Sequence, residues 1–278
     1  MSLALNPVAF KLGPLQVKWY GILMATGVLV ATLMSINEGK KRHIMPDDFI
    51  DFLLWAVPIG FIGARIYYVV FEWGYFSQHP DQIIAIFYAD DLGYGGLIAG
   101  PIVLLIFCHQ RMLPPFLMLD IIAPGVMAAQ VIARWGNFMN QEAHGAKTTL
   151  SFLENLHLPH FIIQQMYING SYYQPTYLYE STLNLIGLIL ILSLRHRKNL
   201  FKRGEIFLSY VIWYSAVRFF VEGMRTDSLY IANTIRVSQA LSLILFFGAI
   251  ILWIYRRKVV KPKWYLTGSG LKYPYNRD

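Results

Sequence analysis

The chain has 278 residues, of which 56% are hydrophobic and 14% charged, and its formal net charge is +8 at pH 7. A soluble domain usually carries about 25% charged residues, so this composition excludes an ordinary soluble enzyme, a disordered chain and a disulfide scaffold. The single cysteine, Cys108, permits no intrachain disulfide and no cysteine-based metal cluster. It lies in an apolar run, where we expect it to pack as a small hydrophobic side chain.

Seven apolar runs follow one another along the chain, and each has about the length of a membrane-spanning helix, roughly 20 residues. We predict an all-α polytopic membrane protein in which residues 1–278 form one membrane domain with seven transmembrane helices. The expected spans cover about residues 19–37, 52–71, 92–108, 116–133, 177–194, 206–220 and 237–255. No internal repeat of the kind found in secondary transporters is visible.

The basic residues between these runs predict the orientation of the chain. Most of the 24 Lys and Arg residues follow the first, third, fifth and seventh runs, and cytoplasmic loops collect Lys and Arg. We therefore expect the N-terminus outside and the C-terminus in the cytoplasm. Residues 134–175 then form a small extracytoplasmic head, and residues 256–278 form a basic cytoplasmic tail that is either solvated or in contact with anionic lipid. The positive charge reflects topology, and we expect no nucleic-acid partner.

Four arginines lie in or beside the outer halves of the predicted spans, where a charge costs about 2.5–3.5 kcal/mol. They are Arg65, Arg134, Arg218 and Arg225. None is close to the basic cytoplasmic ends, so we expect all four to converge on one outward-facing cavity. Arg236, by contrast, is interpreted as an ordinary residue of the outer side.

The sixth run carries a polar helical face. Tyr214, Arg218, Glu222 and Arg225 follow one another at steps of four, four and three residues, a spacing that places them on one side of a helix. For Glu222, an ion pair that only stabilises the end of the helix remains an alternative.

A second polar cluster follows the fourth run. If that helix continues outward, Arg134, Asn137 and Gln141 share a face. An arginine beside amide side chains binds phosphate well, because its planar guanidinium donates several hydrogen bonds in a fixed geometry. Gly145 follows and allows a close approach of the backbone.

The third run opens with Gly93-Tyr94-Gly95-Gly96-Leu97. Glycines at the start of a helix let backbone N–H groups reach a bound anion. Alternatively, these glycines serve only to let neighbouring helices pack closely in the membrane. Among the seven histidines we find no convincing metal-ligand set. His144 lies beside the arginine cluster, and we favour a surface role for it.

Several of these motifs together resemble a known family. Arg134-Trp135-Gly136-Asn137-Phe138, followed by Asn140-Gln141-Glu142 and Gly145, resembles the signature of the prolipoprotein diacylglyceryl transferases. Further matches in the same order are Trp19-Tyr20-Gly21, Gly63-Ala64-Arg65, Gln174-Pro175-Thr176, Leu178-Tyr179-Glu180, Arg218-Phe219 with Glu222, Arg225 and Asp227, and Ser238-Gln239. The resemblance covers nearly the whole chain except the tail.

The resemblance implies a transferase of the bacterial inner membrane that acts in lipoprotein biosynthesis without a metal or other cofactor. Such an enzyme moves the diacylglyceryl group of phosphatidylglycerol to the lipobox cysteine of a prolipoprotein, forming a thioether and releasing glycerol phosphate. The implied partners are phosphatidylglycerol, lipobox-containing signal peptides and membrane lipid.

The resemblance and the residue chemistry together suggest roles for the polar residues. The expected catalytic residues are Arg134, Arg218, Glu142 and Tyr94. The expected substrate-binding residues are Arg134, Asn137, Asn140, Gly145, Tyr20, Tyr214, Glu222, Arg225, Arg65, Gly95 and Gly96. The arginines would stabilise charge on the leaving phosphate. Glu142 and Glu222 would hold the arginines in position or take part in a proton transfer.

Tyr94 is a departure from the family pattern, because many members carry histidine there. A tyrosine, with a pKa near 10, is a poor base at neutral pH. We therefore expect that a histidine at this position is not obligatory.

Other functional classes fit parts of the sequence. An anion channel or transporter would use the arginines as a selectivity ring, but the absence of repeats and the clustering of the arginines disfavour it. Another membrane phospholipid transferase remains an alternative, and a seven-helix receptor would not need so many arginines.

Overall fold

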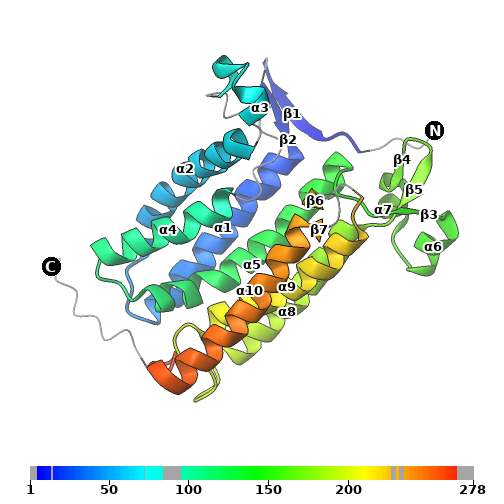
Figure 1. The fold of residues 1–278 in the computed structure, drawn as a ribbon. Coiled ribbons are helices and arrows are strands. Elements are labelled where there is room, and N and C mark those ends of the chain that lie inside the picture. The colour runs from blue at the N-terminus through cyan, green and yellow to red at the C-terminus, as the bar shows by residue number, and fades with distance from the viewer. Residues whose placement is uncertain are drawn as a thin grey trace. The chain divides into compact units, whose positions relative to one another are not determined.

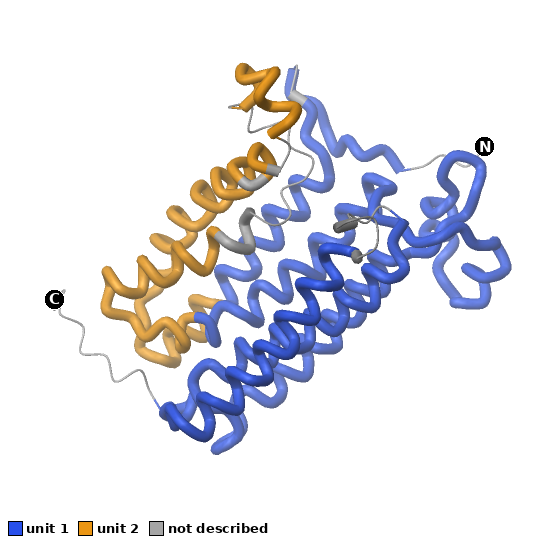
Figure 2. Tube along the Cα trace, viewed as in Figure 1, with its two compact units in different colours: residues 1–34, 119–267 blue, residues 35–118, 268–278 orange. Residues whose placement is uncertain are grey.

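A computed structural model describes residues 5–13, 15–71, 73–83, 95–226, 230–231 and 235–267. The chain divides into two compact units, which Figure 2 shows in different colours. Unit 1 comprises residues 1–34 and 119–267, and unit 2 comprises residues 35–118 and 268–278.

The described residues are mostly helical (Figure 1). The principal helices are α1 (Trp19–Lys40), α2 (Pro46–Phe71), α4 (Gly95–Gln110), α5 (Pro115–Asn140), α8 (Thr176–Leu194), α9 (Glu205–Met224) and α10 (Val237–Tyr255). Within the described residues, six of these are long and apolar enough to cross a membrane. The remaining one, α4, has 16 residues. The chain is therefore a helical, multi-pass membrane protein, and the predicted third span corresponds to the shorter α4.

Small residues let α1 and α5 approach closely within unit 1. A Cβ atom on Gly125 would lie 2.7 Å from the carbonyl oxygen of Ala31, and one on Gly27 would lie 3.2 Å from the Cα of Ala129. Each helix thus presents two small residues four positions apart, a pattern that helices use in membranes, where close backbone packing replaces the hydrophobic effect. On the other side of the unit, α9 packs along both α8 and α10 (Figure 1).

Residues 141–175, which we call the head, form a small folded cap on the ends of α5 and α8. Its elements are β3 (Lys147–Thr148), α6 (Leu150–Asn155), α7 (His160–Gln165), β4 (Tyr167–Ile168) and β5 (Ser171–Tyr173), with the strands in the antiparallel order β3-β5-β4. Its core joins Leu153, Ile162 and Met166 to Phe138 of α5 and Tyr177 of α8. The first seven residues of the predicted head, 134–140, belong instead to α5.

Two hairpins flank the helices of unit 1. The antiparallel pair β1 (Val8–Leu12) and β2 (Leu15–Lys18) precedes α1, and the pair β6 (Tyr230–Ile231) and β7 (Ile235–Arg236) leads into α10. The N-terminal segment is fastened to the head, because the Leu5 amide donates to Gln165 Oε1 at 2.8 Å. Gln165 is itself buried and donates to the Phe138 carbonyl at 3.0 Å.

Unit 2 is built around α2 and α4, which pack along each other. Two short elements, α3 (Trp73–Phe76) and the 3₁₀ turn η1 (Pro80–Gln82), follow α2. Arg111, just after α4, pairs with Asp51 at 2.5 Å and Asp48 at 3.6 Å on α2. Cys108 is buried in this unit, as the packing role predicted for it requires.

Candidate active site

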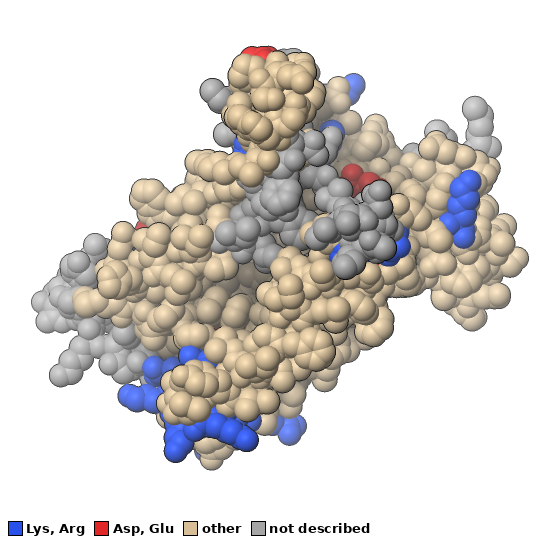
Figure 3. Space-filling model, in the orientation of Figure 1, with Lys and Arg blue, Asp and Glu red and all other residues tan. Residues whose placement is uncertain are grey.

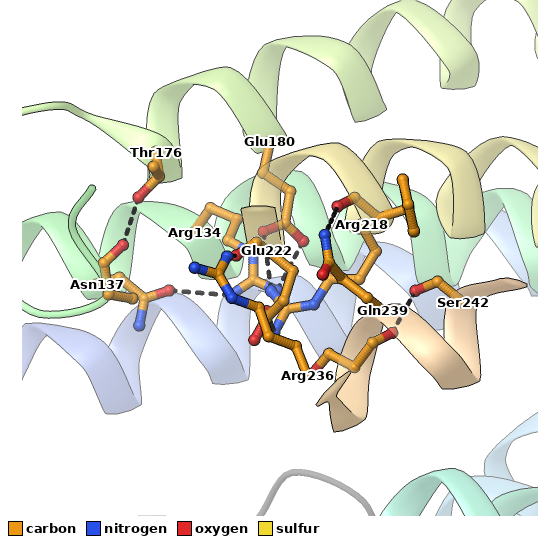
Figure 4. A network of polar contacts seen from close by, with 12 residues as sticks. Arg134, Asn137, Thr176, Glu180, Arg218, Glu222, Arg236, Gln239 and Ser242 are labelled. Atoms are coloured by element: carbon orange, nitrogen blue, oxygen red, sulfur yellow. Dashed lines mark hydrogen bonds and ion pairs between the residues drawn. The ribbon is translucent and has the colours of Figure 1, made fainter. Parts of the chain in front are cut away.

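A carboxylate near the start of α8 joins two of the predicted arginines (Figure 4). Glu180 is 2% exposed, and its Oε1 lies 2.7 Å from Arg134 Nη2 of α5. Its Oε2 lies 3.4 Å from Arg218 Nη1 of α9. Arg218 also reaches Glu222, one helical turn further along α9, with 2.6 Å between Nη2 and Oε2. Three helices of unit 1 therefore meet in one buried ion-pair cluster.

Arg236 belongs to this cluster, so its interpretation as an ordinary outer-side residue is wrong. It immediately precedes α10, and its guanidinium donates to the main-chain carbonyl of Glu222 (Figure 4). Nearby, Gln239 Nε2 donates to the carbonyl of Phe219 at 3.1 Å. The last carbonyls of a helix lack partners within it and readily accept hydrogen bonds from basic side chains. This hydrogen bond to the C-terminal end of α9 places Arg236 at the site.

Arg134 is also fixed from its own helix. Its Nη1 donates to Asn137 Oδ1 at 3.2 Å, and Tyr214 of α9 lies close enough to interact with it electrostatically. Asn137 and Asn140 each donate to Glu142 Oε1, at 3.0 and 3.2 Å. Glu142 therefore acts on Arg134 through Asn137, whereas Glu180 contacts the arginine directly.

The prediction that Gln141 shares a face with Arg134 is wrong. The helix α5 ends at Asn140, and Gln141 adopts a positive φ of 54°. That left-handed backbone conformation ends the helical periodicity. The Gln141 side chain turns to the head instead, where its Nε2 donates to the Gln165 carbonyl at 2.8 Å.

Two glycines permit close contacts at the site. A Cβ on Gly136 would lie 2.5 Å from Cδ2 of Tyr20, which lies in the first turn of α1. A Cβ on Gly145 would lie 2.9 Å from the Cβ of Gln174. Gly145 also forms an isolated β-bridge with Arg225, the residue that ends α9. Any side chain at either glycine would therefore displace a neighbour of the cluster.

A narrow crevice opens beside the ion pairs. It is lined by Arg134, Asn137, Ala143, Thr176, Tyr177, Glu180, Val221 and Arg225, and its empty space is about 160 Å³, open solvent included. Among the described residues at the crevice, the Tyr177 hydroxyl, Nε of Arg134 and, close by, Oδ1 of Asn140 are buried without a hydrogen-bond partner. Buried polar atoms of folded proteins are rarely left without partners, so these atoms are suited to a polar ligand.

The cluster gathers charges of both signs. Among the described residues, its members are Arg134, Arg218, Arg225, Arg236, Glu142, Glu180 and Glu222. Arginines held in place by carboxylates are suited to binding a phosphate.

Comparison with known proteins identifies the family. The family model described as prolipoprotein diacylglyceryl transferase matches residues 7–255. The chain belongs to this family. It is 95% identical over its full length, and over the full length of the relative, to the phosphatidylglycerol–prolipoprotein diacylglyceryl transferase of Lactobacillus johnsonii. The equally named protein of Pediococcus pentosaceus is 56% identical over 96% of this chain and 97% of its own. The predicted family and the predicted transferase activity are thereby confirmed.

Four residues predicted for the site belong to unit 2, and one of them is not described. Arg65 is on α2 of unit 2, is 7% exposed, and donates to the carbonyls of Ile83, at 3.0 Å, and Gln82. Gly95 and Gly96 begin α4 in the same unit. Tyr94 lies outside the described residues. Their participation in the site stays a prediction.

Sequence reasoning assigned no role to Glu180, although the residue stands in one of the recognised motifs. A signal was present, because a carboxylate inside an apolar run is as costly in a membrane as an arginine. His144 is half-buried, and its ring packs on Tyr173 with 4.1 Å between the ring centroids. This contact gives His144 a packing role in the head.

Proposed function

We propose that the cluster around Glu180 is where the chain transfers the diacylglyceryl group of phosphatidylglycerol to the cysteine thiol of a prolipoprotein. The names of relatives that match nearly the whole chain support both substrates. In this reaction the cysteine sulfur forms a bond to a glycerol carbon, and the bond from that carbon to the phosphate oxygen breaks. Glycerol phosphate leaves, and the thiol proton is released. The thiolate is the reactive nucleophile.

The arginines supply the chemistry that the leaving group needs. A phosphodiester carries one negative charge, and the released monoester carries nearly one more at neutral pH. Arg134 and Arg218 bind the phosphate and stabilise the charge that develops as the carbon–oxygen bond breaks. One oriented donor of this kind is typically worth about 2.7–4 kcal/mol in a transition state. The observation that carries the proposal is that one buried carboxylate, Glu180, holds both guanidiniums in place.

The remaining residues bind and orient the headgroup. Asn137 holds Arg134, and the unpartnered Oδ1 of Asn140 accepts a hydrogen bond from a glycerol hydroxyl. Tyr20, Tyr214, Glu222, Arg225 and the backbone at Gly145 complete the binding surface within unit 1. The polar and charged lining of the crevice suits the headgroup, and the acyl chains stay in the bilayer.

The orientation in the membrane forms part of the proposal. Residues 1–278 make one domain of the bacterial inner membrane with seven spans, α4 included, the head outside and the C-terminus in the cytoplasm. The distribution of Lys and Arg supports this arrangement. A membrane-impermeant maleimide tests it in intact cells, with exposed Lys147 or Lys198 replaced by cysteine in a chain whose own Cys108 is buried. Lys147→Cys should be labelled and Lys198→Cys protected; the reverse pattern contradicts the orientation.

The activity is tested with the purified chain, phosphatidylglycerol and a peptide that contains a lipobox cysteine. Mass spectrometry should show the gain of one diacylglyceryl unit, and a peptide with serine in place of that cysteine should gain nothing. Arg134→Ala should abolish the transfer. Arg257→Ala is the matched control, since that arginine is also ion-paired, 3.4 Å from Glu205, at the other end of α9. No adduct from folded native protein, or full activity of Arg134→Ala, would contradict the proposal.

A further inference from the structure

The ends of α8, α9 and α10 opposite the ion-pair cluster carry a second organised region. The loop 195–204 joins α8 to α9, and residues 256–267 follow α10, beginning with the π-helical turn η3 (Arg256–Val260). Main-chain hydrogen bonds tie the two segments together, from the Arg203 amide to the Lys263 carbonyl at 3.0 Å and from the Tyr265 amide to the Phe201 carbonyl at 2.9 Å. The Tyr265 side chain is completely buried. We call these two segments the basic clasp.

The clasp is folded against the bundle rather than loosely attached. Lys261 turns the chain back with a positive φ of 49°. Arg256 Nη2 donates to the Arg203 carbonyl at 3.0 Å, and Arg257 Nη2 donates to the Leu200 carbonyl at 3.0 Å. Residues 261–267 therefore hold a fixed position, unlike the solvated tail that a run of basic residues usually forms.

The carboxylates nearest the clasp are occupied inside the protein. Asp120 of α5 is fully buried and accepts the backbone N–H groups of Gly204, at 2.5 Å, and Phe207, at 2.9 Å, at the start of α9. Glu205 is buried as well; it accepts the Lys202 amide at 2.8 Å and pairs with Arg257, 3.4 Å from its Nε. The two segments of the clasp contain no Asp or Glu in their sequences. Its surface therefore presents positive charge without acidic residues of its own.

The exposed residues of the clasp combine charge with apolar groups. The exposed cations are Arg197, Lys198, Arg257, Lys258, Lys261 and Lys263, and Figure 3 shows the Lys and Arg side chains gathered at this end of α10. Val259, which is 63% exposed, and Val260 stand between Lys258 and Lys261. Lys202 lies over the Trp264 ring, 5.4 Å from its centroid. Basic, aliphatic and aromatic residues in this mixture are typical of the boundary between headgroups and acyl chains.

We propose that the basic clasp is a binding surface for anionic phospholipid headgroups, separate from the transfer site. Three helices of membrane-spanning length end at this surface, which places it at a bilayer boundary. The exposed lysines contact headgroup phosphates, and Val259 and Val260 enter the edge of the acyl region. The fixed position of the clasp keeps these cations together, so that no conformational ordering opposes binding.

Native mass spectrometry of the full chain tests this with phosphatidylserine, an anionic lipid that is not phosphatidylglycerol. The test variant is Lys258→Gln/Lys261→Gln/Lys263→Gln, and the matched control is Lys11→Gln/Lys18→Gln/Lys147→Gln, which also removes three exposed lysines from unit 1. Each lysine near an anionic surface is worth about 1 kcal/mol, or about fivefold in affinity. The test variant should therefore bind phosphatidylserine about 100-fold more weakly, and the control should bind it as the native chain does.

Equal binding by the test variant and the native chain, or an equal loss in the control, would overturn the proposal. A second measurement does not depend on any variant. Raising the salt from 0.1 to 1 M shortens the screening length from about 10 to 3 Å, so the native chain should then lose its preference for phosphatidylserine over phosphatidylcholine. A preference that is insensitive to salt would also overturn it. Diacylglyceryl transfer in detergent should be the same for all three proteins.

Discussion

Replacing Glu180 by glutamine keeps the size and shape of the side chain and removes its charge. Two guanidiniums then lose their shared partner, which lies 2.7 Å from Arg134 and 3.4 Å from Arg218. Removing one member of a buried ion pair typically costs about 3–5 kcal/mol. Arg218 keeps Glu222 at 2.6 Å, and the two arginine side chains are 21% and 16% exposed, so water offsets part of the loss. We expect about 3 kcal/mol of lost stability.

The effect of Glu180→Gln on catalysis should be separable from its effect on stability. If the carboxylate holds the arginines toward the phosphate, kcat/KM for diacylglyceryl transfer should fall about 100-fold, or about 2.7 kcal/mol, mainly through kcat. Glu180→Asp keeps the charge and should recover part of the rate. The assay is the transfer to a lipobox peptide, with rates expressed per folded molecule.

Asp120→Asn is the matched control for this comparison. Asp120 is also a fully buried carboxylate of unit 1, but it accepts backbone N–H groups at the start of α9. Its replacement should lower the midpoint of thermal unfolding while leaving kcat per folded molecule unchanged. If Glu180→Gln also unfolds at a lower temperature but keeps the native kcat per folded molecule, Glu180 has only a structural role. The reasoning about arginine positioning is then refuted.

Three further substitutions test individual contacts. Gly136→Ala should destabilise the protein by about 1–3 kcal/mol, because the new methyl group meets Tyr20, and adding Tyr20→Ala should remove this extra cost in thermal unfolding. Thr176→Val should cost about 1–3 kcal/mol in the same measurement, since it leaves the Ala143 carbonyl without the hydroxyl that donates to it. Arg236→Ala should lower kcat/KM about tenfold by loosening the end of α9; an unchanged rate would remove Arg236 from the site.

Much of the fold can be predicted from the sequence, because a membrane-spanning helix depends mainly on the composition of its own segment. An apolar run of about 20 residues forms a helix in a bilayer whatever its neighbours do. The expected spans 116–133 and 206–220 accordingly lie within α5 and α9. The helices extend further than the apolar runs, since polar residues such as Arg134 and Glu222 continue the same helix beyond the apolar segment.

The site could be predicted only in part from the sequence, because its contacts join segments that are far apart in the chain. The steps Arg134 to Asn137 and Arg218 to Glu222 are helical spacings, and both pairs are in contact. The link from Arg134 to Glu180 depends on how α5 packs against α8, which no spacing reveals. Arg236 was misjudged for the same reason, and the positive φ at Gln141 ended a periodicity that the sequence alone appeared to continue.

The central claim is that Arg134 and Arg218 bind the phosphate that leaves with glycerol. An experimental structure of the full chain with phosphatidylglycerol bound tests it most directly. We expect phosphate oxygens about 2.7–2.9 Å from guanidinium nitrogens of both arginines, the distance of charge-assisted hydrogen bonds. A phosphate held by other residues, with Arg134 and Arg218 still paired only to Glu180 and Glu222, would contradict the claim.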